Sequence, residues 1–278
     1  MRSTTSNRSP IQAAPRESNM ATIPTISAQI QALAASSQHL REMAKQPLPV
    51  LDVDLYLRPV PGGCTALSVN PQRRPQQGTS CRWSTITEVE QLRAARDRTL
   101  ASRTGETRVT PEKALQSFLI RDAIQNKGWM KSITAACQER PKLRFLADEA
   151  SFRDATGKKT VCDLLAVRID GDIGVPVAIE LKSARNLKRL TEQVCATARL
   201  MEKYRSDFQM LAEACWGSPI RLAERAECWI VWPTAGADRH GDLDPRDGKC
   251  RAENVRLVTY SGEPGKELHL QAATRIQP

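Results

Sequence analysis

Two stretches decide the fold of this chain: Thr160-Val-Cys-Asp163-Leu-Leu-Ala-Val167 and Val175-Pro-Val-Ala-Ile-Glu180-Leu-Lys182. Both are short apolar runs bounded by turn-forming residues, a pattern that predicts buried β-strands. The first run contains Asp163. The second places Glu180 and Lys182 on one face, because side chains two residues apart in a strand point the same way. Ionised groups in buried strands are costly unless they are paired or bind a metal. These three residues therefore predict a functional site.

Helices and strands alternate around the two stretches. Thr110 and Pro111 begin a helix, since threonine caps helices and proline suits the first helical position. Asn186 is expected to cap a long helix that reaches about Cys215. Strands are expected at 142–147, 227–232 and 255–260, with a turn at 155–158. The chain is therefore expected to have an α/β fold with a mixed central β-sheet flanked by helices.

The order acid, sixteen intervening residues, acid, one residue, lysine resembles the motif of the PD-(D/E)XK nuclease superfamily. Residues 107–262 resemble the superfamily in element order as well (αβββαβ). Cys162 stands where the motif often has proline. The resemblance implies a restriction-endonuclease-like core and a metal-dependent endo- or exodeoxyribonuclease that hydrolyses phosphodiester bonds by direct attack of water.

The resemblance also implies roles for single residues. Asp163 and Glu180 would hold Mg²⁺, or Mn²⁺ in its place, with the backbone carbonyl of Leu181 as a further ligand. Hard oxygen ligands suit Mg²⁺. Lys182 would lie beside the attacking water, where it positions the nucleophile, offsets charge or loses a proton.

Two further residues extend the predicted site. Glu112 matches an acid that many superfamily members carry on the helix before the sheet, where it binds a second metal or a metal-bound water. Gln193 follows Lys182 by eleven residues and could hydrogen-bond the site or a substrate phosphate. A RecB-like branch has tyrosine four residues after this glutamine, and this chain has Thr197 there.

Each candidate also has an ordinary interpretation. Glu180 and Lys182 could form a solvated pair at a strand edge. Glu112 could be an acid that complements the helix dipole, and Gln193 a glutamine at a helix edge. The acids at 148–149 are expected to be turn residues rather than ligands.

Composition favours nucleic acid, with DNA expected, as the partner. Lysine and arginine number 41 against 31 acids, a net charge of +10, which attracts polyanions. Charge alone leaves simple solubility equally open. The eight cysteines form no CxxC pair, which predicts reduced, buried thiols in a cytoplasmic protein. No apolar run is long enough to span a bilayer, so no membrane partner is expected.

The remaining segments suggest how the chain is organised. We expect a disordered leader at 1–25, an N-terminal extension at 26–106 and a C-terminal tail at 263–278. The extension is expected to contain a helix at 26–45, a hairpin within 50–69, a basic loop at 70–80 and a helix from Ser84. A recognition domain and a lid without a binding role both remain open for it.

Three functions compete at this point. The first is the Mg²⁺-dependent nuclease. The second is a catalytically inactive nuclease fold that binds nucleic acid, and the third is a protein-interaction module. The intact acid–acid–lysine motif favours the first. A homodimer is compatible with it, because cutting both strands of a duplex takes two sites.

Overall fold

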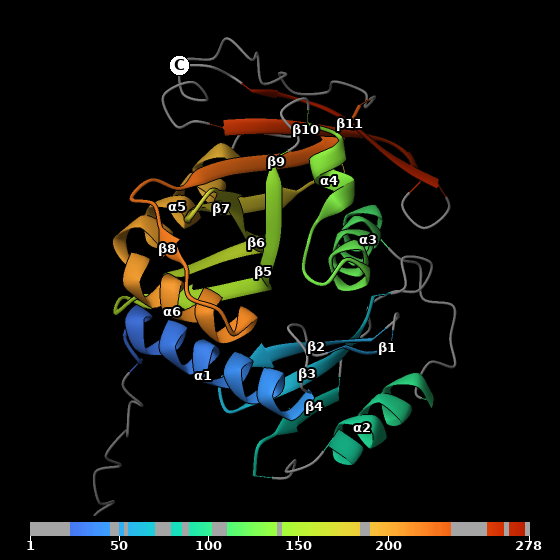
Figure 1. Cartoon of the computed structure of the whole chain (residues 1–278), viewed down its shortest axis with the longest axis vertical. Coiled ribbons are helices and arrows are strands. Elements are labelled where there is room, and N and C mark those ends of the chain that lie inside the picture. The colour runs from blue at the N-terminus through green and yellow to red at the C-terminus, as the bar shows by residue number, and fades with distance from the viewer. Residues whose placement is uncertain are drawn as a thin grey trace, which may run out of the picture.

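The computed structural model describes residues 23–44, 50–52, 55–69, 79–84, 89–101, 110–137, 141–183, 190–234, 255–263 and 267–275. Its centre is a seven-stranded mixed β-sheet with the order β11-β10-β9-β7-β6-β5, to which β8 adds by pairing with β7 (Figure 1). The strands are β5 (Lys142–Arg153), β6 (Lys159–Asp170), β7 (Ile173–Leu181), β8 (Arg221–Leu222), β9 (Glu227–Pro233), β10 (Val255–Glu263) and β11 (Glu267–Arg275). β5, β6 and β7 form an antiparallel meander, whereas β9 is parallel to β7 and β10 is parallel to β9.

Helices cover both faces of this sheet, which explains why its central strands read as continuous apolar runs. One face packs against α1 (Ile26–Ala44), α5 (Leu190–Lys203) and α6 (Arg205–Trp216). The other packs against α3 (Pro111–Gln125) and α4 (Lys131–Ala135). The expected α/β architecture, a mixed sheet flanked by helices, is confirmed.

The start of α3 follows the sequence prediction. The hydroxyl of Thr110 accepts a hydrogen bond from the backbone N–H of Lys113 at 3.4 Å, and Pro111 is the first helical residue. This cap fixes where the helix begins, so it also fixes the position of Glu112 in the first turn.

The single long helix predicted up to Cys215 is wrong, because α5 ends at Lys203 and α6 begins at Arg205. Tyr204 lies between them with φ −109° and ψ 35°. The apolar stripe keeps helical period through the break, so no local pattern predicts the break. The cause is tertiary: α5 lies on β6, β7 and β9, while α6 lies against α1. Asn186, the expected cap, lies outside the described residues.

A second, smaller sheet precedes the main one in sequence. It contains β1 (Val50–Asp52), β2 (Leu55–Val60), β3 (Gly63–Ser68) and β4 (Thr79–Arg82), all antiparallel. β2 and β3 form the expected hairpin, with Gly62 at φ +73° in its turn. The predicted basic loop is wrong at 79–80, because β4 pairs there with β3, whereas 70–78 lie outside the described residues.

The small sheet packs between α1 and α2 (Val89–Ala101) through its own apolar cluster, which includes Leu40, Leu57, Cys64 and Leu92. α1 therefore contacts the small sheet as well as α6 (Figure 1). The start of the helix expected at Ser84 cannot be compared, since residues 85–88 are not among those described.

Two further expectations are corrected at the sheet edges. β5 continues through 148–149, where a turn was expected, with a register shift between Phe145 and Ala147. The tail expected from 263 contains β11, which pairs with β10. Leu268 and Leu270 on β11 pack against the apolar core, which gives the strand a reason to form.

Seven of the eight cysteines fall in the described segments, and all seven are buried free thiols, as predicted for them. None of the described helices is long and apolar enough to cross a membrane.

Candidate active site

The two stretches that opened the sequence analysis are neighbouring antiparallel strands. Leu164 pairs with Ile179 at the end of the β6–β7 ladder, so Asp163 and Glu180 are the next residue on each strand. A carboxylate oxygen of Asp163 (Oδ2) accepts a hydrogen bond from the backbone N–H of Leu181 at 2.8 Å. Asp163 is thereby fixed against the end of β7.

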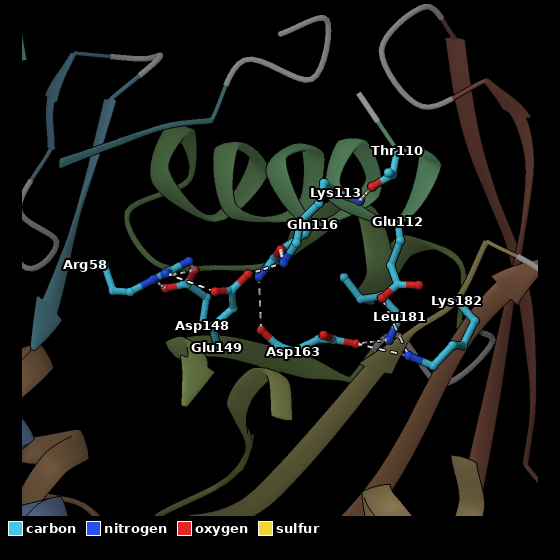
Figure 2. A network of polar contacts seen from close by, with 10 residues as sticks. All are labelled: Arg58, Thr110, Glu112, Lys113, Gln116, Asp148, Glu149, Asp163, Leu181 and Lys182. Atoms are coloured by element: carbon cyan, nitrogen blue, oxygen red, sulfur yellow. Dashed lines mark hydrogen bonds and ion pairs between the residues drawn. The ribbon is translucent and has the colours of Figure 1, made fainter. Parts of the chain in front are cut away.

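Lys182 follows β7 directly, and its ammonium lies among three carboxylates, two of which, those of Glu112 and Asp163, are drawn in Figure 2. Its Nζ is 3.4 Å from Oε2 of Glu180, 3.6 Å from Oε1 of Glu112 and 3.7 Å from Oδ2 of Asp163. The acids come from β7, α3 and β6, three elements that are separate in sequence. The structure therefore brings Glu112 together with the motif residues.

Glu180 is the most deeply placed of these acids. Its side chain has an exposed fraction of 0%, and its Oε1 is buried without a hydrogen-bond partner among the residues that the structure describes. Burial raises the pKa of Glu180, the negative charge of Asp163 raises it further, and Lys182 only partly opposes this. A buried carboxylate with one unsatisfied oxygen is costly, and a group of this kind with a perturbed pKa is a candidate for a functional site.

Both backbone polar groups of Lys182 form hydrogen bonds. Its backbone N–H donates to the carbonyl of Val231 at 2.9 Å, and its own carbonyl accepts from the hydroxyl of Tyr260 at 3.2 Å. Burial lowers the pKa of Lys182, but Asp163, Glu180 and Glu112 outweigh burial, so the net pKa is raised. The side chain is therefore a charged ammonium in this structure.

Asp163 is also held from α3. The amide of Gln116 donates from Nε2 to the backbone carbonyl of Asp163 at 3.4 Å, and its Oε1 accepts from Nζ of Lys113 at 2.8 Å. Lys113 in turn forms an ion pair with Glu149 on β5 (Figure 2). α3 therefore turns Glu112 toward the site and Lys113 toward a second group of charges.

That second group connects the small sheet to the main one. Arg58 on β2 forms ion pairs with Asp148 and, at 3.1 Å, with Glu149. Its Nε lies 2.9 Å from each carboxylate oxygen of Asp148, whose side chain is fully buried. The prediction that both acids are turn residues is wrong, because cations distant in sequence neutralise them within the strand.

Gln193 lies on the exposed side of α5. Its Nε2 donates to the backbone carbonyl of Val161 at 3.4 Å, two residues before Asp163 on β6. The side chain thus binds the main chain of the strand rather than a carboxylate of the site.

Cys162 occupies the motif position where proline is common. Its Sγ donates to the carbonyls of Leu164 at 3.2 Å and Ile179 at 3.4 Å. Burial and the charges of Glu180 and Asp163 raise the pKa of this thiol well above its usual range, so it stays protonated. Its contacts are those of a packed core residue.

The oxygen donors of the site suit a hard cation, although its side chains do not form a complete set of metal ligands among the described residues. In the described part of the chain, no three His, Cys, Asp or Glu side chains form a group that would hold a metal by themselves. Asp163, Glu180 and the main-chain carbonyl of Leu181 supply oxygen donors, and Oε1 of Glu180 lacks a partner. Mg²⁺ prefers oxygen ligands, takes few of them from protein and keeps several waters. This donor set matches that preference.

Two residues of the site were missed by the sequence analysis. Gln116 follows Glu112 by four residues, a spacing that places both on one side of a helix and could have revealed it. Tyr260 ends the run predicted as the last strand and carried no local signal.

Compared with protein-family models, curated proteins and solved structures, the chain shows no match.

Proposed function

We propose that this protein is a Mg²⁺-dependent deoxyribonuclease of the PD-(D/E)XK type. The observation that carries the proposal is the ammonium of Lys182 within 3.4–3.7 Å of three carboxylates from three elements. The element order also supports it: with the short elements α4 and β8 and the helix α6 set aside, α3, β5, β6, β7, α5 and β9 follow the αβββαβ order expected for a restriction-endonuclease-like core.

The charge distribution supports catalysis rather than DNA binding alone. The whole chain carries +10, which favours contact with DNA, yet this end of β6 and β7 gathers three acids around one lysine. Uncompensated carboxylates repel a phosphate. Such a group serves nucleic-acid chemistry only if a cation neutralises it, so a divalent ion is the natural complement.

The mechanism assigns separate roles to the side chains. Asp163 and Glu180 would hold Mg²⁺, which when bound supplies positive charge to the phosphate and acidifies a water. Lys182, as an ammonium, orients the attacking water and offsets charge on the phosphate oxygens. Glu112 lies close enough to Lys182 to fix its direction. Water forms the new bond to phosphorus and the bond to the 3′ oxygen breaks, leaving 5′-phosphate and 3′-hydroxyl ends.

Cleavage of labelled single-stranded, duplex and branched DNA and of RNA, with Mg²⁺, Mn²⁺ or EDTA, tests the proposal. Wild type should cut at least one DNA substrate only with metal, and Lys182→Ala should abolish cutting. Lys203→Ala is the matched control, because this lysine is exposed and its Nζ lies 5.4 Å from the ring centre of Tyr204. Full activity of Lys182→Ala, or activity in EDTA, contradicts the mechanism. Salt-dependent binding that persists in EDTA without cleavage of any substrate indicates the inactive binding module instead.

A further inference from the structure

A cavity of about 510 Å³ lies at the opposite end of β6 and β7 from the carboxylates. Its wall includes the turn at 171–172 between these strands, whereas the acids lie at the other ends of the strands. Asp163 and Asp170 are seven residues apart on β6, so the two places are separated by roughly 23 Å at about 3.3 Å per strand residue. The cavity is therefore a separate place on the molecule.

Arg144 on β5 is held in this wall by two indole rings. Its guanidinium carbon lies 4.5 Å from the ring centre of Trp216 and 5.5 Å from that of Trp129. Trp216 is itself fixed, because its Nε1 donates to the carbonyl of Phe145 at 3.1 Å. Cation–π contacts thus order the guanidinium group. They leave the N–H donors in the plane of the guanidinium available for hydrogen bonds.

The hydrogen-bond donors of Arg144 lack acceptors. Within the described segments its side chain makes no hydrogen bond and no ion pair, and its Nε is buried without a partner. Burial lowers the pKa of this group, and no carboxylate compensates for that. An ordered guanidinium with free donors in a cavity is a prepared anion site, because its planar fork matches two oxygens of a phosphate.

The other charges of the wall are one arginine and two acids, Arg221, Glu213 and Asp172. Arg221 on β8 also lines the cavity, is exposed and has no ion pair among the described residues. Glu213 is engaged within the wall, since its Oε1 accepts from Gln209 at 3.2 Å and from the backbone N–H of Ile220 at 3.3 Å. Asp172 lies on the exposed turn, where water screens its charge.

We infer that this cavity binds a nucleotide through its phosphate, with Arg144 as the fork and Arg221 as a second cation. Trp129, Ile169 and Ile220 give the same cavity apolar wall against which a base can pack, and the volume suits a small ligand. The nucleotide is either a free mononucleotide or the phosphorylated end of a strand. The inference does not depend on the proposed nuclease activity.

Calorimetric titration in EDTA, which stops metal-dependent cleavage, tests the inference. The probes are inorganic phosphate, dAMP, and one short oligonucleotide with a 5′-phosphate or a 5′-hydroxyl end. Wild type should bind dAMP more tightly than phosphate. Binding of the phosphorylated oligonucleotide above dAMP identifies a strand end, whereas binding of dAMP alone identifies a free nucleotide.

Matched variants assign the binding to the cavity. Arg144→Gln should weaken nucleotide binding by about tenfold or more, since it removes a charged bidentate contact. Arg144→Lys keeps the charge but loses the bidentate geometry, so its affinity should lie between those of wild type and Arg144→Gln. Arg221→Gln should weaken binding less than Arg144→Gln does. Arg225→Gln is the control, with a side chain 91% exposed. Asp163→Ala should bind like wild type, which separates this site from the carboxylates.

Two results overturn the inference: no probe binds wild type, or Arg144→Gln and Arg221→Gln both bind like wild type. Thermal unfolding of every variant shows whether it folds. Should Arg144→Gln fail to fold, Arg221→Gln decides, because its exposed side chain has no part in the core.

Discussion

Two groups of charges each include a residue from the first turn of α3. They differ in the number of cations that face their acids. In the first, Asp148 and Glu149 face Arg58 and Lys113, two acids against two cations. In the second, Glu112, Asp163 and Glu180 face one cation among the described residues, Lys182. Glu112 and Lys113 are neighbours on α3, yet Lys113 belongs to the first group and Glu112 to the second.

The acids respond to this difference. Burial tends to raise the pKa of Glu149, but Arg58 and Lys113 outweigh it and the net pKa is lowered. Burial raises the pKa of Glu180, and Asp163 raises it again. Asp148 is fully buried and keeps a raised pKa, yet Arg58 opposes the shift directly. The first group is neutralised within the protein and links the two sheets, whereas the second keeps an excess of acids among the described residues.

The largest expected effect concerns activity in the second group. Asp163→Asn should slow metal-dependent cleavage by at least about 10²-fold, because it removes a charged donor of the proposed metal site. The rate of cleavage of the best substrate under single-turnover conditions is the measurement. Asp170→Asn at the other end of β6 is the control, since its carboxylate is exposed and lies 3.4 Å from Arg168 on the same strand. Equal losses in both variants would contradict the assignment.

The next effect concerns stability in the first group. Arg58→Met should lower the free energy of unfolding by about 3–5 kcal/mol, because Asp148 is left buried and unpaired. Urea unfolding at neutral pH measures this. Arg93→Met is the matched control, since its ion pair with Glu90 lies on the surface of α2 and should contribute less than about 1 kcal/mol. If the two variants lose the same stability, the bridge between the sheets is not what Arg58 provides.

A pH effect in the metal-free protein separates the groups further. The pKa of Glu180 is raised from 4.5 to about 8. A raised carboxyl pKa means that the folded state binds the proton more tightly, so stability is lost as pH rises from about 4.5 toward 8. Glu180→Gln should therefore be more stable than wild type at pH 8, by roughly 1–4 kcal/mol, and inactive. Unfolding in EDTA at pH 5 and pH 8 is the measurement, and a difference that does not grow with pH contradicts the prediction.

The smallest expected effect comes from Tyr260. Tyr260→Phe removes the hydrogen bond to the carbonyl of Lys182 and should lower kcat by about threefold to tenfold with KM unchanged, the range of one neutral hydrogen bond. Tyr204→Phe is the control, because Tyr204 packs against the apolar core on the face covered by α5 and α6, whereas α3 and Glu112 lie on the other face. Unchanged kcat in Tyr260→Phe would mean that the strand pairing with β9 alone positions Lys182.

Sequence patterns predicted most of the features that depend on residues close together in the chain. The cap at Thr110, the hairpin of β2 and β3, and the strands that carry Asp163 and Glu180 depend on neighbouring residues, and all four are in place. The break at Tyr204 and the strand role of Asp148 were missed. Each depends on a partner far away in sequence, the packing of α6 on α1 in one case and Arg58 in the other.

The sequence by itself determined the α/β plan and the placement of Asp163 and Glu180 on strands, with Lys182 two residues after Glu180, because strand periodicity fixes which side chains share a face. Only the tertiary structure decided which other charges meet. In the folded chain Glu112 lies beside Lys182, and Lys113 forms an ion pair with Glu149. Arg144 contacts two tryptophan rings and no carboxylate among the described residues. The physical reason is that charge pairing and burial depend on distance in space, which a sequence specifies only through the complete fold.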